Sequence, residues 1–266
     1  RFLANMSHEI RTPINTIMGM DEMILREDAT GISEEYSGAI KNYAVSIKKA
    51  SEILLGLIND ILDLSKIESG KMNLIETNYD TVEAIRNVVS MIRVRSNEKG
   101  LNFKVEIDRD IPKILYGDAG KLKQVVLNLL TNALKYTDDG GFTLKIALIE
   151  KRENSCVLYF GVKDTGIGIK KEDIKKIFAP FERVDEVKNE AVQGTGLGLN
   201  ISRQFVKLMG SELKCESEYG EGSTFFFTLE QKVINSDPIG EFVEKYDEKP
   251  SGRYIPKFIA PDAKIM

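Results

Sequence analysis

Residues 117–137 read G-D-A-G-K-L-K-Q-V-V-L-N-L-L-T-N-A-L-K-Y-T. The apolar residues of this stretch recur at helical spacing, which puts Val125 and Leu129 on the side that would face a core. Asn128, Asn132 and Lys135 recur at the same spacing and share a polar face. Amides in an otherwise apolar stretch need partners; their oxygens are ligands for Mg²⁺, and a nearby lysine can hold a phosphate. The stretch therefore predicts a helix with a polar site on one side.

Two glycine-rich stretches follow this helix. Residues 164–168 read D-T-G-I-G and come shortly after the apolar run V-L-Y-F-G-V. A carboxylate at a strand end can accept a hydrogen bond from an exocyclic amine, and glycines let a base lie against the backbone. Residues 194–199 read G-T-G-L-G-L and open a helical pattern, so their amides could bind a phosphate. Their spacing is that of neither a Rossmann fold nor a P-loop, so the predicted nucleotide site belongs to another class.

The rest of the second half alternates between helical and strand patterns. Helices are expected at residues 81–98, 118–136, 171–177 and 197–209. Strands are expected at residues 101–107, 142–150, 155–163, 211–217 and 223–230. A sheet covered by helices, an α/β sandwich, accounts for this order. Residues 182–196 predict a long loop that could serve as a lid, and the prolines and glycines from residue 232 onward predict a linker.

The first 70 residues predict two long helices, at 1–27 and 34–68, joined by a turn. The second helix has an apolar seam at alternating spacings of three and four: Ile40, Tyr43, Ile47, Ala50, Leu54, Leu57, Ile61 and Leu64. Two such helices form an antiparallel hairpin, which has no closed core of its own. A second copy would complete a four-helix bundle, so a homodimer is expected. The alternative is a hairpin that packs against its own downstream domain.

Residues 2–13 read F-L-A-N-M-S-H-E-I-R-T-P and include His8, the only histidine of the chain. A neutral imidazole is a competent nucleophile near neutral pH, and the neighbouring Glu9 could take up its proton. Taken alone, a His-Glu pair on a helix is more often a solvated surface pair. The histidine count excludes a metal site or a catalytic pair built from two histidines of this chain.

The composition narrows the class of protein. The chain has 266 residues, 42% of them hydrophobic, and a net charge of −4, which does not favour nucleic-acid binding. Two cysteines, Cys156 and Cys215, are too few for a disulfide framework and predict free thiols in a reducing compartment. No apolar run is long enough to cross a bilayer. Because the chain begins at Arg1, inside a helical pattern and without an initiator Met, we expect a fragment whose upstream part is missing.

Five stretches resemble the boxes of the histidine kinase family, in family order, over residues 1–230. Residues 2–13 resemble its H box and residues 127–137 its N box; D-T-G-I-G-I resembles the G1 box, I-F-A-P-F-E-R-V-D the F box and G-T-G-L-G-L the G2 box. The resemblance implies an α+β multidomain fold in three parts. These are a hairpin for dimerisation and histidine phosphotransfer at 1–70, forming a dimeric four-helix bundle; an ATP-binding α/β sandwich of the Bergerat type shared with gyrase, Hsp90 and MutL at 71–231; and a linker at 232–266.

The same resemblance implies roles for individual residues of the hairpin and the helix. His8 would be the phosphoacceptor, Glu9 its general base, and Thr12 the residue that orients water for dephosphorylating a partner. Asn132 and Asn128 would bind Mg²⁺, with Asn132 the stronger candidate. The remaining nucleotide contacts on this helix would be the phosphate-binding lysine and the aromatic that packs on adenine, Lys135 and Tyr136.

Beyond this helix, the resemblance implies that Asp164 reads the adenine amino group and that Gly166 and Gly168 make room for the base. Thr224 matches a position near the adenine. The lid would be anchored by two phenylalanines, would carry an arginine that reaches the γ-phosphate, and would end in the glycine-rich stretch beside the phosphates. These lid residues are Phe178, Phe181, Arg183, Gly194, Thr195, Gly196, Leu197 and Gly198.

The function implied is that of a bacterial two-component kinase. The resemblance also implies a cytoplasmic location, an upstream sensor domain missing from this fragment, and a parent that could be membrane-anchored. ATP with Mg²⁺ would phosphorylate His8, and the phosphoryl group would pass to an aspartate of a response-regulator receiver domain, which the protein could also dephosphorylate. The last residues, P-D-A-K-I-M, resemble the start of a receiver, so the parent is expected to be a hybrid kinase. Two alternatives remain: an ATPase of the gyrase, Hsp90 and MutL type, which needs no H box, and a nucleotide-sensing dimer scaffold without catalysis.

Overall fold

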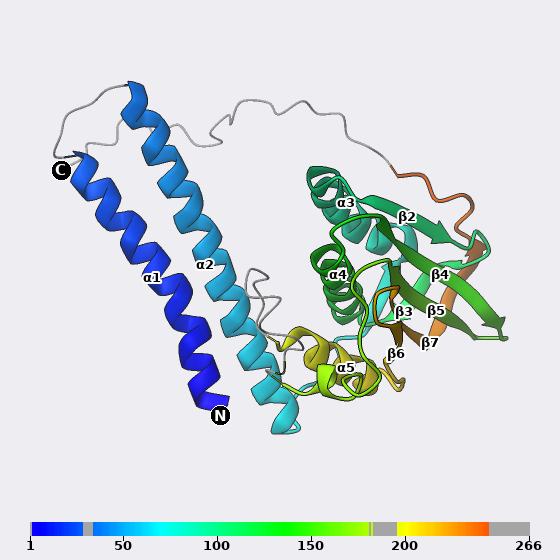
Figure 1. Cartoon of the computed structure of the whole chain (residues 1–266). Coiled ribbons are helices and arrows are strands. Elements are labelled where there is room, and N and C mark those ends of the chain that lie inside the picture. The colour runs from blue at the N-terminus through cyan, green and yellow to red at the C-terminus, as the bar shows by residue number, and fades with distance from the viewer. Residues whose placement is uncertain (1, 29–33, 181, 183–195, 245–266) are drawn as a thin grey trace, which may run out of the picture.

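A computed structural model of the chain describes residues 2–28, 34–180, 182 and 196–244. Within the first two helices, the side chains of residues 2–9, 11, 25–28, 34–39 and 41 are not described. A helical hairpin occupies one end of the molecule and a sheet covered by helices the other (Figure 1). This arrangement confirms the helical N-terminal part followed by a mixed α/β part that the sequence predicts.

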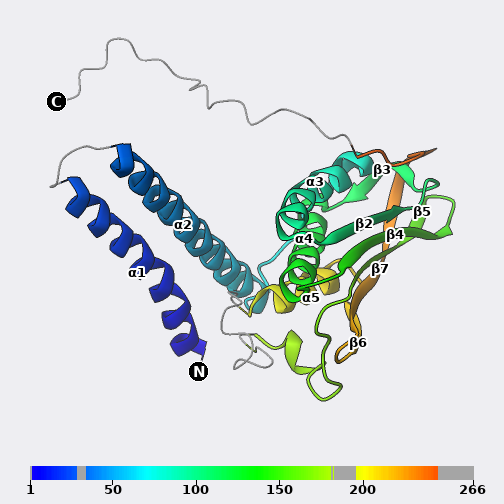
Figure 2. The ribbon, with the colours of Figure 1, turned by 45° about the horizontal axis from the view of Figure 1, so that its top comes forward.

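The hairpin consists of α1 (Phe2–Asp28) and α2 (Glu34–Glu68), which pack along each other. The apolar seam of α2 lies inside this pair, since Ala50 and Leu57 are buried. Leu64, on the same seam, is buried against the core of the sheet domain instead. The hairpin is antiparallel, so α1 begins near the end of α2 that leads into the sheet domain (Figures 1 and 2).

The sheet has seven strands in the order β1-β3-β7-β5-β4-β2, with β6 paired to β7 beyond this path. Among the described strands, only β2 and β4 are parallel, and every other pair is antiparallel. The strands are β1 (Thr77–Asp80), β2 (Asn102–Ile107), β3 (Pro112–Gly117), β4 (Gly141–Lys151), β5 (Ser155–Asp164), β6 (Lys214–Glu218) and β7 (Gly222–Pro238).

Three helices cover one face of the sheet, the face turned toward the hairpin (Figures 1 and 2). They are α3 (Thr81–Lys99), α4 (Ala119–Tyr136) and α5 (Gly198–Leu208). Asp80 and Asp118 begin α3 and α4, each accepting a hydrogen bond from a backbone N–H three residues on, at 2.9 Å. The sequence-predicted core side of α4 is confirmed, because Val125 and Leu129 are at most 1% exposed. Each fully buried side chain of this size stabilises the fold by about 1.5–3 kcal/mol.

Some expected elements are corrected by the structure. The helix expected at 171–177 is a series of turns that ends in a short 3₁₀ helix, η1 (Lys176–Phe178). Its turns are held by Asp173, whose carbonyl accepts from Lys176 and Ile177. Strands β1 and β3 were not predicted. Each is short, and their pairing with each other and with β7 is a long-range contact that leaves no local signal.

The expected linker starts later than residue 232. Strand β7 runs to Pro238 because its second half pairs with β3. The following segment is also fixed: the Ile239 N–H donates to the Ile111 carbonyl at 2.9 Å, and Phe242 packs against the core. Glu244 then pairs with Arg93 of α3, with 2.9 Å between Nε and Oε2. The folded part of the domain therefore extends at least to residue 244.

Side chains join the end of α2 to the sheet domain. Asp63 of α2 accepts from Lys121 Nζ and from Gln124 Nε2 of α4, both at 3.3 Å. Lys121 Nζ also lies 4.2 Å from the centre of the Phe205 ring of α5. This contact involves only the last turns of α2. The alternative in which the hairpin packs against its own downstream domain therefore applies to these turns and not to the rest of the described hairpin.

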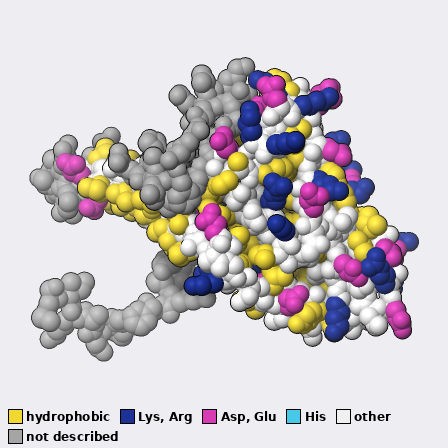
Figure 3. All heavy atoms as spheres, turned by 90° about the horizontal axis from the view of Figure 1, so that it is seen from below, with side chains coloured by type: hydrophobic (Ala, Val, Ile, Leu, Met, Phe, Trp, Pro, Cys, Tyr) yellow, Lys and Arg dark blue, Asp and Glu magenta, His cyan; other side chains and the backbone are white. Residues whose placement is uncertain are grey.

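The surfaces of the two parts differ. Seen from below, hydrophobic side chains run along the hairpin, whereas cationic and anionic side chains are interspersed over the sheet domain (Figure 3). The helices of the described residues include none that is both long enough and apolar enough to cross a bilayer.

Candidate functional site

The polar face of α4 contacts α5 through Asn128, while the helix as a whole also packs against α3, β4 and β5. Asn128 and Asn132 are both half-buried but differ in their partners. Asn128 Nδ2 donates to Ser202 Oγ of α5 at 2.9 Å. Asn132, one turn on, forms no side-chain hydrogen bond with any described residue. Asn132 therefore has a carboxamide with no partner among the described residues, whereas the Nδ2 of Asn128 helps to hold α4 to α5. The oxygen of neither amide accepts a hydrogen bond from a described residue.

Asp164 ends β5 and is 6% exposed. Its Oδ1 accepts from two backbone amides, Gly166 N at 2.9 Å and Ser223 N at 3.2 Å. Its Oδ2 has no partner among the described residues. One oxygen is thus fixed by the protein, and the other remains a pure acceptor for a ligand.

Burial raises the pKa of the Asp164 carboxyl above its ordinary value, although the amides of Gly166 and Ser223 oppose this. Desolvation disfavours the charged form, whereas hydrogen bonds to the carboxylate favour it. The net direction shows that the two amides do not fully compensate for lost water. A buried carboxylate with one open oxygen is a frequent feature of ligand sites.

The turn after Asp164 contacts the end of α4. The Ile167 N–H donates to the Tyr136 carbonyl at 3.2 Å, and a Cβ on Gly166 would collide with the same carbonyl. Gly168 has a φ of +66°, and a Cβ there would strike the Glu218 carbonyl. Both glycines therefore let the protein's own backbone approach closely. The room for a base that the sequence suggested stays a prediction.

The N-terminus of α5 lies against α4 because Gly198 lacks a side chain. A Cβ on Gly198 would collide with Oδ1 of Asn128. Gly196, with a φ of +67°, turns the chain into the helix, and Leu197 is fully buried. No side chain of the described residues caps the start of α5, so none of them competes with a ligand for the first amides of this helix.

Asn132, Asp164 and the start of α5 together form what we call the polar centre. The remaining expected residues of the described chain lie around it. Lys135 Nζ lies 4.9 Å from the centre of the Tyr136 ring at the end of α4. Thr224 is half-buried on β7 and pairs with Lys163, the residue before Asp164. α4, the turn after β5 and the start of α5 thus come together, although they lie far apart in the sequence.

Phe178 is buried beside α5 rather than next to Asp164. Its ring meets Phe225 edge-on with 6.5 Å between centroids, and its carbonyl accepts from Asn200 Nδ2 at 2.8 Å. The guanidinium of Arg203 lies 5.3 Å from the ring centre. Phe178 therefore holds the segment that ends at residue 180 to α5. Its role in anchoring a lid stays a prediction.

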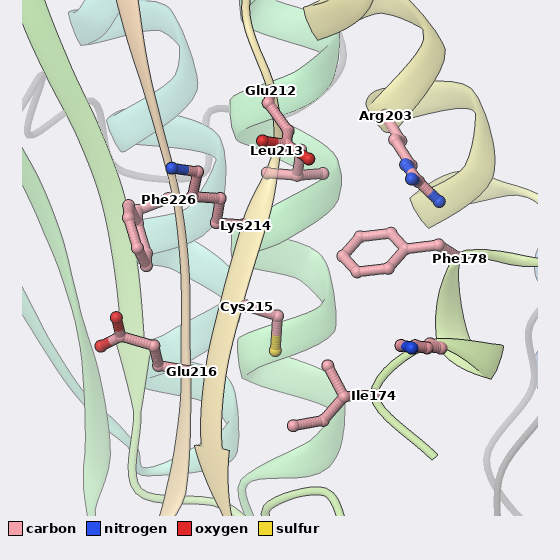
Figure 4. Close-up of a pocket in the computed structure, with 10 residues that line it drawn as sticks. Ile174, Phe178, Arg203, Glu212, Leu213, Lys214, Cys215, Glu216 and Phe226 are labelled. Carbon is pink, nitrogen blue, oxygen red and sulfur yellow. The ribbon is translucent and has the colours of Figure 1, made fainter. Parts of the chain in front are cut away.

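A depression of about 590 Å³ lies beside β6, and Phe178 lines it together with Ile174, Arg203 and Cys215. Figure 4 shows Cys215 of β6 on one side of the depression, with Ile174 and the Phe178 ring on the other. Burial raises the pKa of Cys215 to about 12, and the Asp164 carboxylate adds to the shift. The thiol is therefore protonated and unreactive at neutral pH. Neither Asp164 nor Asn132 lines this depression, so it is separate from the polar centre.

Several expected residues fall outside what the structure describes. Phe181, Arg183, Gly194 and Thr195 lie outside the described residues. His8 and Glu9 belong to the second turn of α1, but their side chains are not among those described. Thr12 is exposed one turn later, and its carbonyl accepts from Thr16 Oγ1 at 3.0 Å.

Sequence reasoning missed the residues that hold the expected ones in place. Ser202 binds Asn128, Asn200 binds the Phe178 segment, and the Ser223 amide binds Asp164. These contacts join segments that are distant in the chain, so no local pattern indicates them. Asn200 and Ser202 follow the G-T-G-L-G-L stretch closely, and Ser223 directly precedes an expected residue; this proximity is the only signal the sequence offers.

Two models of known families match the chain. The model described as "Histidine kinase-, DNA gyrase B-, and HSP90-like ATPase" matches residues 117–233, and that of the "His Kinase A (phospho-acceptor) domain" matches residues 1–70. This chain belongs to the histidine kinase family. The first match contains the whole polar centre and the second contains the hairpin.

Relatives and solved structures agree with this membership. Hybrid signal transduction histidine kinase B of Dictyostelium discoideum is 37% identical over 88% of this chain and 12% of that protein. Sensor histidine kinase GacS of Pseudomonas protegens is 37% identical over 89% of this chain and 25% of that protein. The structure of full-length ShkA in complex with AMPPNP has a TM-score of 0.63 and 28% identity, over 88% of this chain and 46% of that one.

The histidine kinase AdeS of Acinetobacter baumannii, at 23% identity and a TM-score of 0.56, shares the fold over 86% of this chain and 98% of its own. The chain spans a quarter or less of the length of the two curated relatives above. Relatives also include a peroxide stress-activated histidine kinase of Schizosaccharomyces pombe, 35% identical over 93% of this chain and 11% of that protein. The sequence analysis had suggested a bacterial kinase. Because the relatives include eukaryotic proteins, membership of the family does not assign the chain to bacteria.

Proposed function

We propose that this chain is the catalytic core of an autophosphorylating protein-histidine kinase, which transfers the γ-phosphoryl group of ATP to His8. The observation that carries the proposal is the state of Asp164: one carboxylate oxygen is bound by two backbone amides and the other has no partner among the described residues. A buried, oriented acceptor at the end of a strand suits the exocyclic amine of adenine. The amides at the start of α5, which no described side chain caps, supply the complementary site for phosphates.

The residues around Asp164 fit the rest of the nucleotide. Tyr136 would pack on the base, with Gly166, Gly168 and Thr224 beside it. Lys135 would contact a phosphate from the end of α4. The lid residues Phe181, Arg183, Gly194 and Thr195 stay predictions, as do the roles of Gly196, Leu197 and Gly198 beside the phosphates.

The donor set also fits Mg²⁺. Asn132 has a half-buried carboxamide without a partner among the described residues, and an amide oxygen is a suitable ligand for this ion. Asn128 would support Asn132 from the preceding turn while it binds Ser202. When bound with ATP, Mg²⁺ neutralises charge on the phosphates during transfer.

The phosphotransfer step follows from the chemistry of the H box. A neutral imidazole nitrogen of His8 attacks the γ-phosphorus of ATP, the bond to the β,γ-bridging oxygen breaks, and ADP leaves with that electron pair. Glu9 accepts the imidazole proton. The second turn of α1 lies at the end of the hairpin from which α2 leads into the sheet domain (Figure 1). This end is the part of α1 that the nucleotide domain would have to reach for transfer.

The hairpin supports a homodimer. Beside the seam that packs inside the pair, α2 carries a second apolar row formed by Leu55, Ile58 and Leu62, which are 43–60% exposed. On α1, Ile14 and Met18 are exposed one turn apart. Water-exposed apolar rows on a two-helix unit are covered when a second hairpin completes a four-helix bundle.

The phosphoryl group would then pass from His8 to an aspartate of a receiver domain, and Thr12 would orient water when the protein dephosphorylates that receiver. The names of the hybrid relatives and the tail P-D-A-K-I-M support a receiver in the same parent chain. We divide the chain accordingly into a phosphotransfer hairpin at 1–70, an ATP-binding domain from 71 and a linker toward the receiver, whose start moves from 232 to beyond 244.

Incubation with γ-³²P-labelled ATP and Mg²⁺ tests the kinase proposal. We expect label on the protein that is labile in acid and stable in alkali, as a phosphohistidine is. His8→Gln should abolish this label and leave ATP affinity nearly unchanged, because His8 is the only histidine and is far from Asp164 in the sequence. Release of phosphate without protein label would favour the ATPase alternative, and nucleotide binding without turnover the scaffold.

A further inference from the structure

Lys99, the last residue of α3, reaches across to the end of α4. Its Nζ donates to the carbonyl of Thr137 at 2.7 Å and to that of Leu134 at 3.0 Å. The Lys135 carbonyl and Asp138 Oδ1 lie farther away, at 3.5 and 3.4 Å. One ammonium group therefore meets several carbonyls at the end of α4.

The carbonyls account for this contact, and the ion pair contributes little. The Asp138 side chain is 91% exposed, and an ion pair with so exposed a partner adds little stability in water. The last carbonyls of a helix, by contrast, have no partner within the helix and carry the negative end of its dipole. A cation that donates to several of them fixes the position of that turn.

The same turn is also held by the segment that follows Asp164. The Ile167 N–H donates to the Tyr136 carbonyl at 3.2 Å, and the Gly141 N–H donates to Thr165 Oγ1 at 3.1 Å. The end of α4 and the turn after it are thus bound between α3 and the Asp164 turn. The Lys99 contacts and the Asp164 turn together set where Lys135 and Tyr136 stand relative to Asp164.

We infer that Lys99 is a positioning residue of the nucleotide site: it holds the last turn of α4 so that Lys135 and Tyr136 face the nucleotide bound by Asp164. The inference rests on the proposed ATP site and extends it to a residue outside all five boxes. Lys99 itself does not touch the nucleotide in this scheme. Its effect is on affinity, because the turn must be held in place before the base and phosphates can be bound.

The test is ADP affinity of the full chain, measured by isothermal titration calorimetry at a temperature well below the unfolding midpoint of each variant. Lys99→Met removes the donors and keeps the length of the side chain, and we expect it to weaken ADP binding by roughly three- to tenfold. Lys99→Arg restores a cationic donor and should return affinity to within about twofold of wild type. In the autophosphorylation assay, Lys99→Met should raise KM for ATP and leave kcat nearly unchanged.

Lys104→Met is the matched control, because Lys104 also forms an exposed ion pair, with Glu106 at 2.6 Å, but on β2. It should bind ADP as wild type does. Wild-type affinity in Lys99→Met, an equal loss in Lys104→Met, or failure of Lys99→Arg to restore binding would each overturn the inference and leave the ATP site intact. A wild-type chain that binds no ADP would overturn the proposed function itself.

Discussion

Replacing Asp164 by asparagine changes one atom of the polar centre and tests what that atom does. In the wild-type chain, Oδ1 accepts from Gly166 N and Ser223 N, and Oδ2 has no partner among the described residues. In the Asp164→Asn variant, the new carboxamide would keep its oxygen against the two amides, since its NH₂ group can only donate. The NH₂ group then occupies the open position and faces the adenine amino group, donor against donor.

The expected loss of affinity follows from this geometry. A charge-assisted hydrogen bond to a buried carboxylate contributes about 1.5–3 kcal/mol, which corresponds to roughly 10- to 100-fold in ADP affinity. The two opposed donors push the result toward the upper end of that range. We therefore expect Asp164→Asn to weaken ADP binding by at least about tenfold.

The stability of the protein without nucleotide should change in the opposite direction. The pKa of Asp164 is raised in the folded state, chiefly by burial, so the folded protein binds a proton at this site more readily than the unfolded chain. The free energy of unfolding contributed by Asp164 is thus largest below the ordinary pKa of 3.8 and falls as pH rises through the raised folded pKa. Asparagine does not titrate, so at neutral pH the variant should be at least as stable as wild type.

Calorimetric titration with ADP and thermal unfolding between pH 4 and pH 8 measure both effects on one preparation. Asp237→Asn, an exposed aspartate at the end of β7, is the control and should change neither quantity. Wild-type ADP affinity in Asp164→Asn would refute the assignment of the adenine acceptor. Weaker binding together with a lower unfolding midpoint at pH 7 would refute the reasoning on burial, since the carboxylate would then be stabilising the fold.

Three further outcomes are expected. Asn132→Asp should weaken nucleotide binding by about 10- to 100-fold and alter metal preference, because it adds a negative charge beside the phosphates. Titration with ADP in Mg²⁺ and in Mn²⁺ measures both effects. Unchanged affinity would place the metal elsewhere. Thr12→Ala should keep autophosphorylation within a few-fold and lose most receiver dephosphorylation; with a purified cognate receiver, equal loss of both rates would assign Thr12 to the helix alone. Leu62→Lys should dissociate the dimer in sedimentation equilibrium without loss of helicity by circular dichroism, because Leu62 is 51% exposed within one hairpin. An unchanged mass would exclude the row of Leu55, Ile58 and Leu62 from the dimer interface.

The elements that could be predicted from the sequence are those whose signal is local. The seam of α2 and the core side of α4 are periodic over many residues, and the boundaries of α2 and α4 agree with the prediction. The boxes likewise stand in the sequence as short runs, so the family could be identified from their order. Where local signal was weak, prediction failed: residues 171–177 have helical composition but form turns around Asp173.

Which atoms of those boxes remain open to a ligand depends on contacts between segments that are distant in the chain. Asn128 and Asn132 stand one turn apart on the same helix, and only the structure shows that the former binds Ser202 while the latter has no partner among the described residues. The hydrogen bond that leaves one oxygen of Asp164 open joins β5 to β7, and the hydrogen bonds of Lys99 join α3 to the end of α4. Both depend on segments that are far apart in the chain. Periodicity fixes which face of a helix a side chain shares, because it depends on spacing along one chain. Hydrogen-bond partners depend on which segments meet in space, and the sequence pattern does not encode that locally.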